Sequence, residues 1–282
     1  MYRRATTVQE ALDDLHKATG AKAILAGGTD MMIQLRSQNG SPIRLVDITR
    51  IPELSGIEQR NGGIWIGALT TMSQLAASPL ILGKIPVLAK AAASVGSPQI
   101  RNRATIGGNL CHASPCADTV PPLVALNAAL QLRSRRGIRQ LSVEDFVLGA
   151  YRVAIDTEEL LEGIQIPVPP PQMRMTFYKL GRRKALAIAR INLAVGLQLA
   201  NGRIADAVVS PGSIMPVPKR LRSVEKKLIG QKPSSDLFQT IGREVSELMV
   251  TESGERWSTP YKKPVVAALV ARCLEQCLEG RA

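Results

Sequence analysis

A proline-rich run near the middle of the chain sets the strongest limit on how this sequence can fold. Residues 166–171 read Ile-Pro-Val-Pro-Pro-Pro. Because proline lacks a backbone N–H and its ring fixes φ, the run is expected to form neither a helix nor a central strand. We therefore predict a linker here, with one domain over residues 1–170 and a second over residues 172–282.

The two segments differ in charge. Residues 1–171 carry 17 basic and 14 acidic side chains, whereas residues 172–282 carry 19 and nine. The resulting net charge of +10 in the second segment suits an acidic protein partner or an anionic cofactor. Nucleic acid is not predicted as a partner. Only 3% of the residues are aromatic, which leaves few rings to stack on bases, and no nucleic-acid-binding motif occurs.

The cysteine content and the hydropathy of the sequence indicate in which cellular compartment the protein is expected. Four cysteines in 282 residues do not make a disulfide scaffold, so we expect a reduced, cytoplasmic protein. The longest apolar stretches, around 121–132 and 265–270, fall short of the roughly 20 residues that a membrane-spanning helix needs. No membrane span is predicted, and the first 17 residues lack the apolar core of a secretion signal.

Capping and turn signals predict an α+β fold. Thr7 with Glu10 marks the start of a helix, and so does Thr71 with Gln74. Asn-Gly or Arg-Gly pairs at 61–62, 136–137 and 201–202 predict three β-hairpins. The segment 96–122 is rich in glycine and proline and is expected to be irregular. Further strands are expected over 23–26 and 45–48, and helices over 86–95, 217–229, 235–249 and 261–279.

The first candidate binding loop is Ala26-Gly27-Gly28-Thr29-Asp30, between a short apolar strand and a short helical run. Paired glycines let the backbone approach a ligand closely. Successive free N–H groups in such a loop make a site for phosphate. The alternative is an ordinary turn from strand to helix.

The second candidate loop runs from Arg101 to Asn109 and is followed by Asp118. It combines the Gly107-Gly108 pair with hydroxyl and amide side chains. Its backbone N–H groups and Thr105 could hold a diphosphate, and Asp118 could accept from a sugar or ribityl hydroxyl. No Rossmann glycine motif and no Walker lysine accompany either loop, so a dinucleotide site of those two kinds is excluded.

Taken together, these motifs resemble the FAD-binding medium subunit of molybdenum hydroxylases, the relatives of xanthine dehydrogenase, carbon monoxide dehydrogenase and 4-hydroxybenzoyl-CoA reductase. The resemblance rests on Ala26–Asp30, on Thr105–Asn109 and on Ala113-Ser114-Pro115 with Asp118. It continues through Glu159–Ile166 and Tyr178–Lys184, and so covers nearly the whole chain.

The resemblance implies a two-subdomain FAD-binding domain of the vanillyl-alcohol-oxidase type, with subdomains at about 1–55 and 56–170, and a small α+β C-terminal domain. It implies a complex with a molybdopterin-binding large subunit and a [2Fe-2S] small subunit. Electrons would pass from the iron–sulfur clusters to FAD in this chain, and then to NAD+ or another acceptor.

The resemblance also implies which residues contact FAD. The first loop would hold the diphosphate through its amides, the second loop would complete the cradle, and Leu161 would pack on the isoalloxazine. Tyr178 and Lys179 both remain candidates for a flavin-facing position. Arg103 beside the second glycine pair could neutralise the diphosphate, or belong to a solvated loop. The full set is Ala26, Gly27, Gly28, Thr29, Asp30, Arg103, Thr105, Ile106, Gly107, Gly108, Asn109, Asp118, Leu161, Tyr178 and Lys179.

The sequence departs from the family at one position near the flavin. Val95 stands where animal members carry an aromatic residue ten positions before the loop hydroxyl. Access of a nicotinamide would then be controlled differently, or the acceptor would not be NAD+. The cysteine-rich insert of the 4-hydroxybenzoyl-CoA reductase branch is not visible, so no cluster or other metal is expected in this chain.

Other reactive side chains have simpler interpretations. Cys111 and Cys116 do not have metal-ligand spacing, and we expect a buried or half-buried pair. His112 either bonds the flavin or faces solvent. Arg182-Arg183-Lys184 is either a solvated cluster or a docking site for an acidic subunit. No catalytic acid, base or nucleophile is predicted. Two alternatives stay open: a free-standing FAD-dependent oxidoreductase, and a basic, non-enzymatic binding protein whose glycine loops are only turns.

Overall fold

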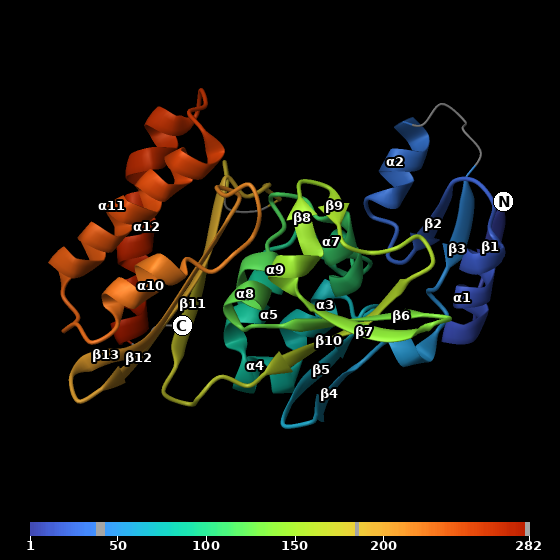
Figure 1. Ribbon diagram of the computed structural model, residues 1–282, viewed down its shortest axis with the longest axis horizontal. Helices are drawn as coiled ribbons and strands as arrows, with labels where there is room; N and C mark the ends of the chain where they lie inside the picture. Colours follow the sequence, from blue (N-terminus) through green and yellow to red (C-terminus); the bar gives the residue numbers. More distant parts are fainter. Residues whose placement is uncertain (38–42, 184–185, 280–282) are drawn as a thin grey trace.

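A computed structural model describes residues 1–37, 43–183 and 186–279. Within these ranges, three sheets of three or more strands follow one another across the molecule, each with its own helices (Figure 1). Among the described residues, no helix is long and apolar enough to cross a membrane. Residues from all three parts line a large cavity.

The first part is a small parallel sheet with the strand order β1-β3-β2. Its strands are β1 (Tyr2–Arg4), β2 (Lys22–Leu25) and β3 (Arg44–Asp47). Helix α1 (Val8–Lys17) begins where Thr7 accepts a hydrogen bond from the Glu10 amide, and it buries its apolar stripe against the sheet. Helix α2 (Met31–Ser37) follows β2, and no residue of it is buried. A 3₁₀ turn (Pro52–Leu54) leads into the second part.

The second part is a five-stranded antiparallel sheet with the order β4-β5-β10-β6-β7. Its helices and the short β8–β9 ribbon supply most of the largest apolar core. The strands are β4 (Ile57–Arg60), β5 (Gly63–Gly67), β6 (Ala129–Ser134), β7 (Gly137–Ser142) and β10 (Leu160–Pro167). The other elements are α3 (Met72–Ala77), α4 (Pro79–Lys84), α5 (Pro86–Ala93), α6 (Pro98–Arg101), α7 (Ile106–His112), α8 (Val120–Ala125), α9 (Val143–Phe146), β8 (Val147–Gly149) and β9 (Arg152–Val153).

The third part is a three-stranded antiparallel sheet, β11-β12-β13, packed between two sets of helices (Figure 1). Phe177, Ala194 and Val208 on one face belong to the core of the second part. The opposite face packs on the C-terminal helices. The elements are β11 (Arg174–Leu180), β12 (Ile191–Ala200), β13 (Arg203–Gly212), α10 (Arg222–Leu228), α11 (Ser235–Ser253) and α12 (Thr259–Glu279).

The prediction that residues 166–171 avoid a central strand is wrong at its first two residues. Ile166 and Pro167 close the central strand β10, opposite Ile64 and Gly63 of β5. Pairing with β6 ends two residues earlier, at Gln165. From there β10 has a neighbour on one side only, so the missing N–H of proline costs little.

The prediction of an irregular segment over 96–122 is also wrong, because this segment contains α6, α7 and the start of α8. Ser97 and Thr105 cap α6 and α7 through their hydroxyl groups, and Pro98 occupies the first turn of α6. Proline at the first helical position and a hydroxyl residue before it are helix-start signals. In a sequence they are easily mistaken for loop composition.

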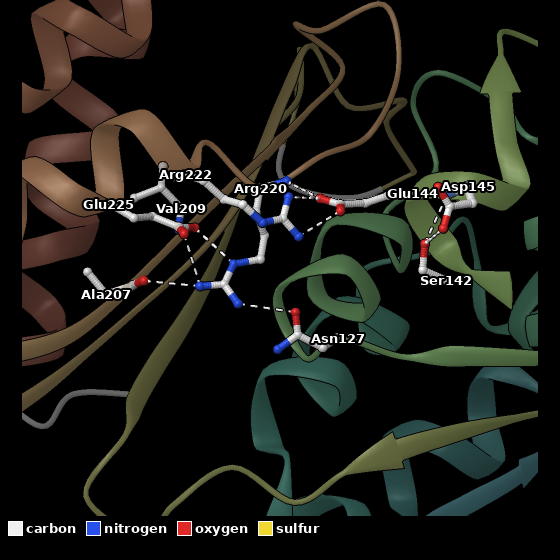
Figure 2. A network of polar contacts seen from close by, with 9 residues as sticks. All are labelled: Asn127, Ser142, Glu144, Asp145, Ala207, Val209, Arg220, Arg222 and Glu225. Carbon is white, nitrogen blue, oxygen red and sulfur yellow. Dashed lines mark hydrogen bonds and ion pairs between the residues drawn. The ribbon is translucent and has the colours of Figure 1, made fainter.

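An arginine-rich cluster joins the third part to the second (Figure 2). The Arg222 guanidinium donates to both carboxylate oxygens of Glu144, at 3.0 and 2.8 Å. Arg220 makes the same two-pronged contact with the buried Glu225, at 3.0 and 2.9 Å, and reaches Asn127 Oδ1 at 3.1 Å. Its backbone N–H also donates to Glu144. The cluster therefore fixes the third sheet against helix α9.

The buried Asp47 predicts an acid-sensitive contribution to stability. Burial raises the pKa of this carboxyl, but hydrogen bonds from the Thr49 hydroxyl and amide, Tyr2 and Arg4 outweigh it and hold the pKa at about 2. A lowered pKa in the folded state stabilises the protein above the ordinary Asp pKa of about 3.9 and loses that effect as the pH falls toward 2. We expect Asp47→Asn to lower the free energy of unfolding by about 1–2 kcal/mol at pH 7, measured by urea titration.

The same comparison at acidic pH supplies the check. The difference between wild type and Asp47→Asn should shrink as the pH approaches 2, whereas Glu53→Gln, at an exposed position, should have little effect throughout. An Asp47→Asn difference that is equal at pH 7 and pH 3 would show that the carboxylate charge is not what stabilises this sheet.

Candidate cofactor-binding site

A cavity of about 1000 Å³ lies between the first sheet, helix α7 and the edge of the third sheet. Both predicted glycine loops contribute to its wall, and so do the start of β10 and the end of β11. This volume lies at the upper end of the roughly 300–1,000 Å³ typical of small-molecule pockets. It therefore suits a ligand of dinucleotide size.

The first loop turns from β2 into α2 with its glycines against neighbouring backbone. Gly28 has a φ of +76°, a left-handed conformation that favours glycine. A Cβ on Gly27 would lie 2.0 Å from the Arg103 carbonyl oxygen. No side chain fits there, so glycine allows the first loop to touch the segment that leads into α7.

The same loop presents a row of unengaged amides to the cavity. Within the described part of the chain, the N–H groups of Gly27, Gly28, Thr29 and Asp30 have no hydrogen-bond acceptor. All four residues line the cavity. Consecutive amides that await an acceptor make a concave anion site, so this loop can hold a phosphate group with backbone atoms alone.

The second loop differs from the sequence-based expectation, because the amides around its glycine pair are already used. The N–H of Ile106 donates to Thr70, that of Gly107 to Ala68, and those of Gly108 and Asn109 both to Thr105. The glycines of this loop instead allow close packing of its backbone on neighbouring residues and on the cavity. A Cβ on Gly107 would lie 2.7 Å from the Ala68 Cβ, and Gly108 opens on the cavity beside the Thr105 hydroxyl. The Asn109 side chain accepts a hydrogen bond from Thr119 inside the scaffold.

Asp118 and Lys179 form a buried ion pair at the cavity wall. The ammonium group lies 2.5 Å from the carboxylate and also donates to the Ser94 carbonyl at 2.8 Å. Burial raises the pKa of Asp118, and Lys179 and Asn192 oppose that effect. Asn192 is fully buried on β12 and donates to Asp118 and to the Ala117 carbonyl. The pair therefore joins the second part to the third at the cavity wall.

Strand alternation separates the two candidates on β11. Lys179 lines the cavity, whereas Tyr178 packs with the apolar core of the third part, where the Arg272 guanidinium lies 5.7 Å from its ring centre. Leu161 at the start of β10 is buried and lines the cavity. Two other predicted side chains do not reach the cavity wall: Ile106 is buried in the core, and Arg103 contributes its carbonyl against Gly27.

A polar cluster at the rim connects the two loops. His112 at the end of α7 lies 3.6 Å from the Asp30 carboxylate and 3.4 Å from the Gln34 amide. The ring of Tyr151 meets His112 edge-on at 5.1 Å. His112 thus contacts both the first loop and α2.

The cysteines are not arranged for chemistry. Cys111 and Cys116 are free thiols on the cavity wall, and burial raises the pKa of Cys111 to about 12. Burial likewise raises the pKa values of Cys273 and Cys277, inside the third core, to about 12. No group of three or more metal-ligating side chains occurs among the residues for which the structure gives positions. Lys184 of the predicted basic cluster lies outside the described residues.

Several residues at the cavity wall, or directly behind it, were not predicted from the sequence. Asn192 could have been noticed as a polar residue inside a continuous apolar run. Tyr151 could have been noticed as one of the few aromatic residues, two positions after Gly149. Others gave no local signal and are wall residues only in the folded chain, among them Lys22, Ile33, Gln34, Leu186, Ala187 and Ile188.

Two family models match the chain. Residues 1–169 match the FAD binding domain in molybdopterin dehydrogenase, and residues 176–277 match the CO dehydrogenase flavoprotein C-terminal domain. The glyceraldehyde dehydrogenase medium chain of Sulfolobus acidocaldarius is 32% identical over 275 residues, which cover 98% of this chain and 97% of that one. The nicotinate dehydrogenase FAD-subunit of Eubacterium barkeri is 32% identical over 278 residues, with 97% and 94% covered.

Solved structures agree with these matches. The carbon monoxide dehydrogenase of Hydrogenophaga pseudoflava includes a chain that superposes with a TM-score of 0.92 at 27% identity, covering 100% of this chain and 98% of that one. A chain of quinoline 2-oxidoreductase from Pseudomonas putida 86 gives 0.90 at 26% identity, with 99% and 97% covered. The predicted α+β fold, an FAD-binding domain followed by a C-terminal domain, is thereby confirmed. The chain belongs to the family of FAD-binding medium subunits of molybdenum hydroxylases.

Proposed function

We propose that this chain binds FAD in the cavity, receives electrons from a [2Fe-2S] partner subunit, and passes them to NAD+ or another acceptor. The bound FAD supplies the redox chemistry. The protein binds it, orients it and shapes the electrostatic field around it. The free-standing oxidoreductase of the same fold is the alternative that the experiments below separate.

The row of unengaged amides at Gly27–Asp30 is the observation that carries the proposal. A diphosphate needs several donors in a small space, and four successive N–H groups supply them without side chains. The cavity of about 1000 Å³ extends from this loop past Gly108 to Leu161 and Lys179. The residues present therefore fit an elongated dinucleotide whose charged centre lies at the first loop.

The ion pair at the cavity wall gives the chain a way to influence the cofactor. Lys179 is held by Asp118 and the Ser94 carbonyl, and its side chain is 13% exposed. A fixed cation in a poorly solvated site favours negative charge nearby. We assign to Lys179 the role of favouring the reduced cofactor, with Asp118 and Asn192 holding it in place.

The names of the relatives support an assembly of several subunits. They include medium chains of carbon monoxide dehydrogenase and the medium subunit of nicotine 6-hydroxylase. We propose a molybdopterin-binding large subunit and a [2Fe-2S] small subunit as partners of this chain. The net charge of +10 over residues 172–282 suits an acidic docking surface on one of them.

The part of the cavity wall at residues 95–97 bears on the proposed electron acceptor. Val95, Gly96 and Ser97 line the cavity where an aromatic side chain would narrow it. On the same cavity, Leu186 and Ile188 are exposed apolar side chains. This wall leaves room for a nicotinamide or for a smaller acceptor.

Binding of FAD is the first test. Purified protein should bind FAD saturably with a perturbed absorption spectrum, and should bind FMN far more weakly because FMN lacks the diphosphate.

Gly108→Val should abolish FAD retention, since its Cβ would lie 2.9 Å from the Thr105 hydroxyl and its branches would enter the cavity. The melting temperature without FAD should change less. Wild-type affinity in Gly108→Val would place the cofactor elsewhere.

The role of Lys179 predicts a change in reduction potential. Lys179→Met should lower the midpoint potential of bound FAD by on the order of 30–60 mV, a ten- to hundredfold shift for a two-electron couple. Spectroelectrochemical titration measures it. Lys90→Met, at an exposed position on α5, is the control and should leave the potential unchanged. An unchanged potential in Lys179→Met would remove this role.

Co-purification separates the subunit from the free-standing enzyme. The tagged chain, isolated from its own cells, should bring down a larger molybdenum-containing subunit and a smaller iron–sulfur subunit in equal amounts. Recovery of the chain alone, with full substrate-dependent reduction of its FAD, would contradict the subunit role and favour the free-standing oxidoreductase.

A further inference from the structure

The central strand β10 carries a β-bulge at the point where it leaves the cavity wall. Leu161 lies opposite Leu132 of β6, but Gly163 lies opposite the next residue, Gln131. An advance of two residues along β10 thus corresponds to an advance of one residue along β6, and Glu162 is the extra residue. Bulges of this kind redirect side chains next to functional sites.

The bulge decides which face of the sheet Leu161 occupies. Side chains alternate along a strand, so in a regular strand Leu161 would face away from Ile164 and Ile166. With one extra residue in between, all three belong to the same core, on the side of the helices. Leu160 then turns to the core of the first part. Leu161 reaches its place on the cavity wall because of the bulge.

The side chain of Glu162 is clamped on the neighbouring strand. Arg133 donates to both carboxylate oxygens, at 3.0 and 2.8 Å, and the Gln131 amide donates at 2.8 Å. The Glu162 side chain is only 12% exposed. A two-pronged, charge-assisted contact of this kind fixes geometry as well as adding stability.

The backbone of Glu162 leads directly to the second glycine loop. Its carbonyl accepts a hydrogen bond from the Ala68 N–H at 3.1 Å, and the Ala68 carbonyl accepts one from Gly107 at 2.9 Å. Gly107 also lies in close contact with Ala68, where a side chain would not fit. The bulge and the start of α7 are therefore held in register by two backbone hydrogen bonds through one residue.

Gly163, the residue after Glu162, is covered by a tryptophan ring on the other face of the sheet. The ring of Trp65 lies across Gly163, so close that a Cβ there would be 2.3 Å from the ring. The Arg60 guanidinium lies 4.9 Å from the centre of that ring. Gly163 thus marks the end of the bulge, and the strand beyond it runs in regular pairing with β5.

We propose that Glu162, clamped by Arg133 and Gln131, is a positioning residue of the cofactor site. It does not line the cavity. It fixes the bulge that turns Leu161 to the wall, and through Ala68 it fixes the distance of the Gly107–Gly108 loop. The inference rests on the proposed function, because it assumes that FAD occupies this cavity.

The test compares Glu162→Ala with a matched variant at a second arginine–glutamate pair. In the full chain, Glu162→Ala should weaken FAD binding by about tenfold or more and shift the absorption bands of the flavin that remains bound. Glu144→Ala removes the equally two-pronged contact with Arg222 (Figure 2), at a pair outside the cavity lining. It should lower the melting temperature to a similar extent with FAD affinity within about twofold of wild type.

Glu162→Gln keeps one acceptor oxygen and the length of the side chain. Its affinity and its flavin spectrum should lie between those of wild type and Glu162→Ala, and it replaces the alanine variant if that variant does not fold. Equal affinities and identical flavin spectra in wild type and the folded Glu162 variants would overturn the inference while leaving the proposed function intact. Equal losses of affinity in the Glu162 and Glu144 variants would also overturn it, because stability alone would then explain the effect. Absence of FAD binding in wild type would instead contradict the proposed function.

Discussion

The contact of Gly27 with the Arg103 carbonyl is the constraint on which the rest of the site depends. It brings the loop after β2 directly against the segment that leads into α7, and no residue with a side chain could replace Gly27 there. The cavity lies beside this junction, and residues of both loops line it. Gly27 therefore lets a loop of the first part pack directly on a loop of the second part, in addition to leaving room for a ligand.

The rest of the cavity wall comes from parts of the chain that are distant in the sequence. The five-stranded sheet supplies Leu161 through the bulge at Glu162, and the third sheet supplies Lys179 through its ion pair with Asp118. Each of these side chains is held by a partner from a different element. The C-terminal part is consequently more than an attachment, because without it the cavity would lack its buried cation.

Local chemistry made much of the fold predictable. The Thr7 and Thr71 caps and the turn at Asn61-Gly62 act within a few residues, and the structure places helices and a hairpin there. The glycine loops were recognisable because their composition is unusual. Predictions failed where a residue had two meanings, as with Pro98, which starts a helix, and Pro167, which ends a central strand.

What the sequence could not provide were long-range partners. The amides of the second glycine loop look free in the sequence, but Ala68 and Thr70 from another segment take up two of them. Tyr178 and Lys179 could be distinguished only once the two faces of β11 were known. Asn192 entered the site only because β12 passes behind Asp118. Motifs identify which loops matter, whereas the fold decides which atoms remain available.

The central claim is that the four free amides of the first loop hold the diphosphate of FAD. A crystal structure of the protein with FAD bound tests it most directly. The account predicts phosphate oxygens within hydrogen-bonding distance of the N–H groups of Gly27–Asp30, with the flavin ring extending toward Leu161 and Lys179. A diphosphate bound away from this loop, with these amides still unengaged, would contradict it.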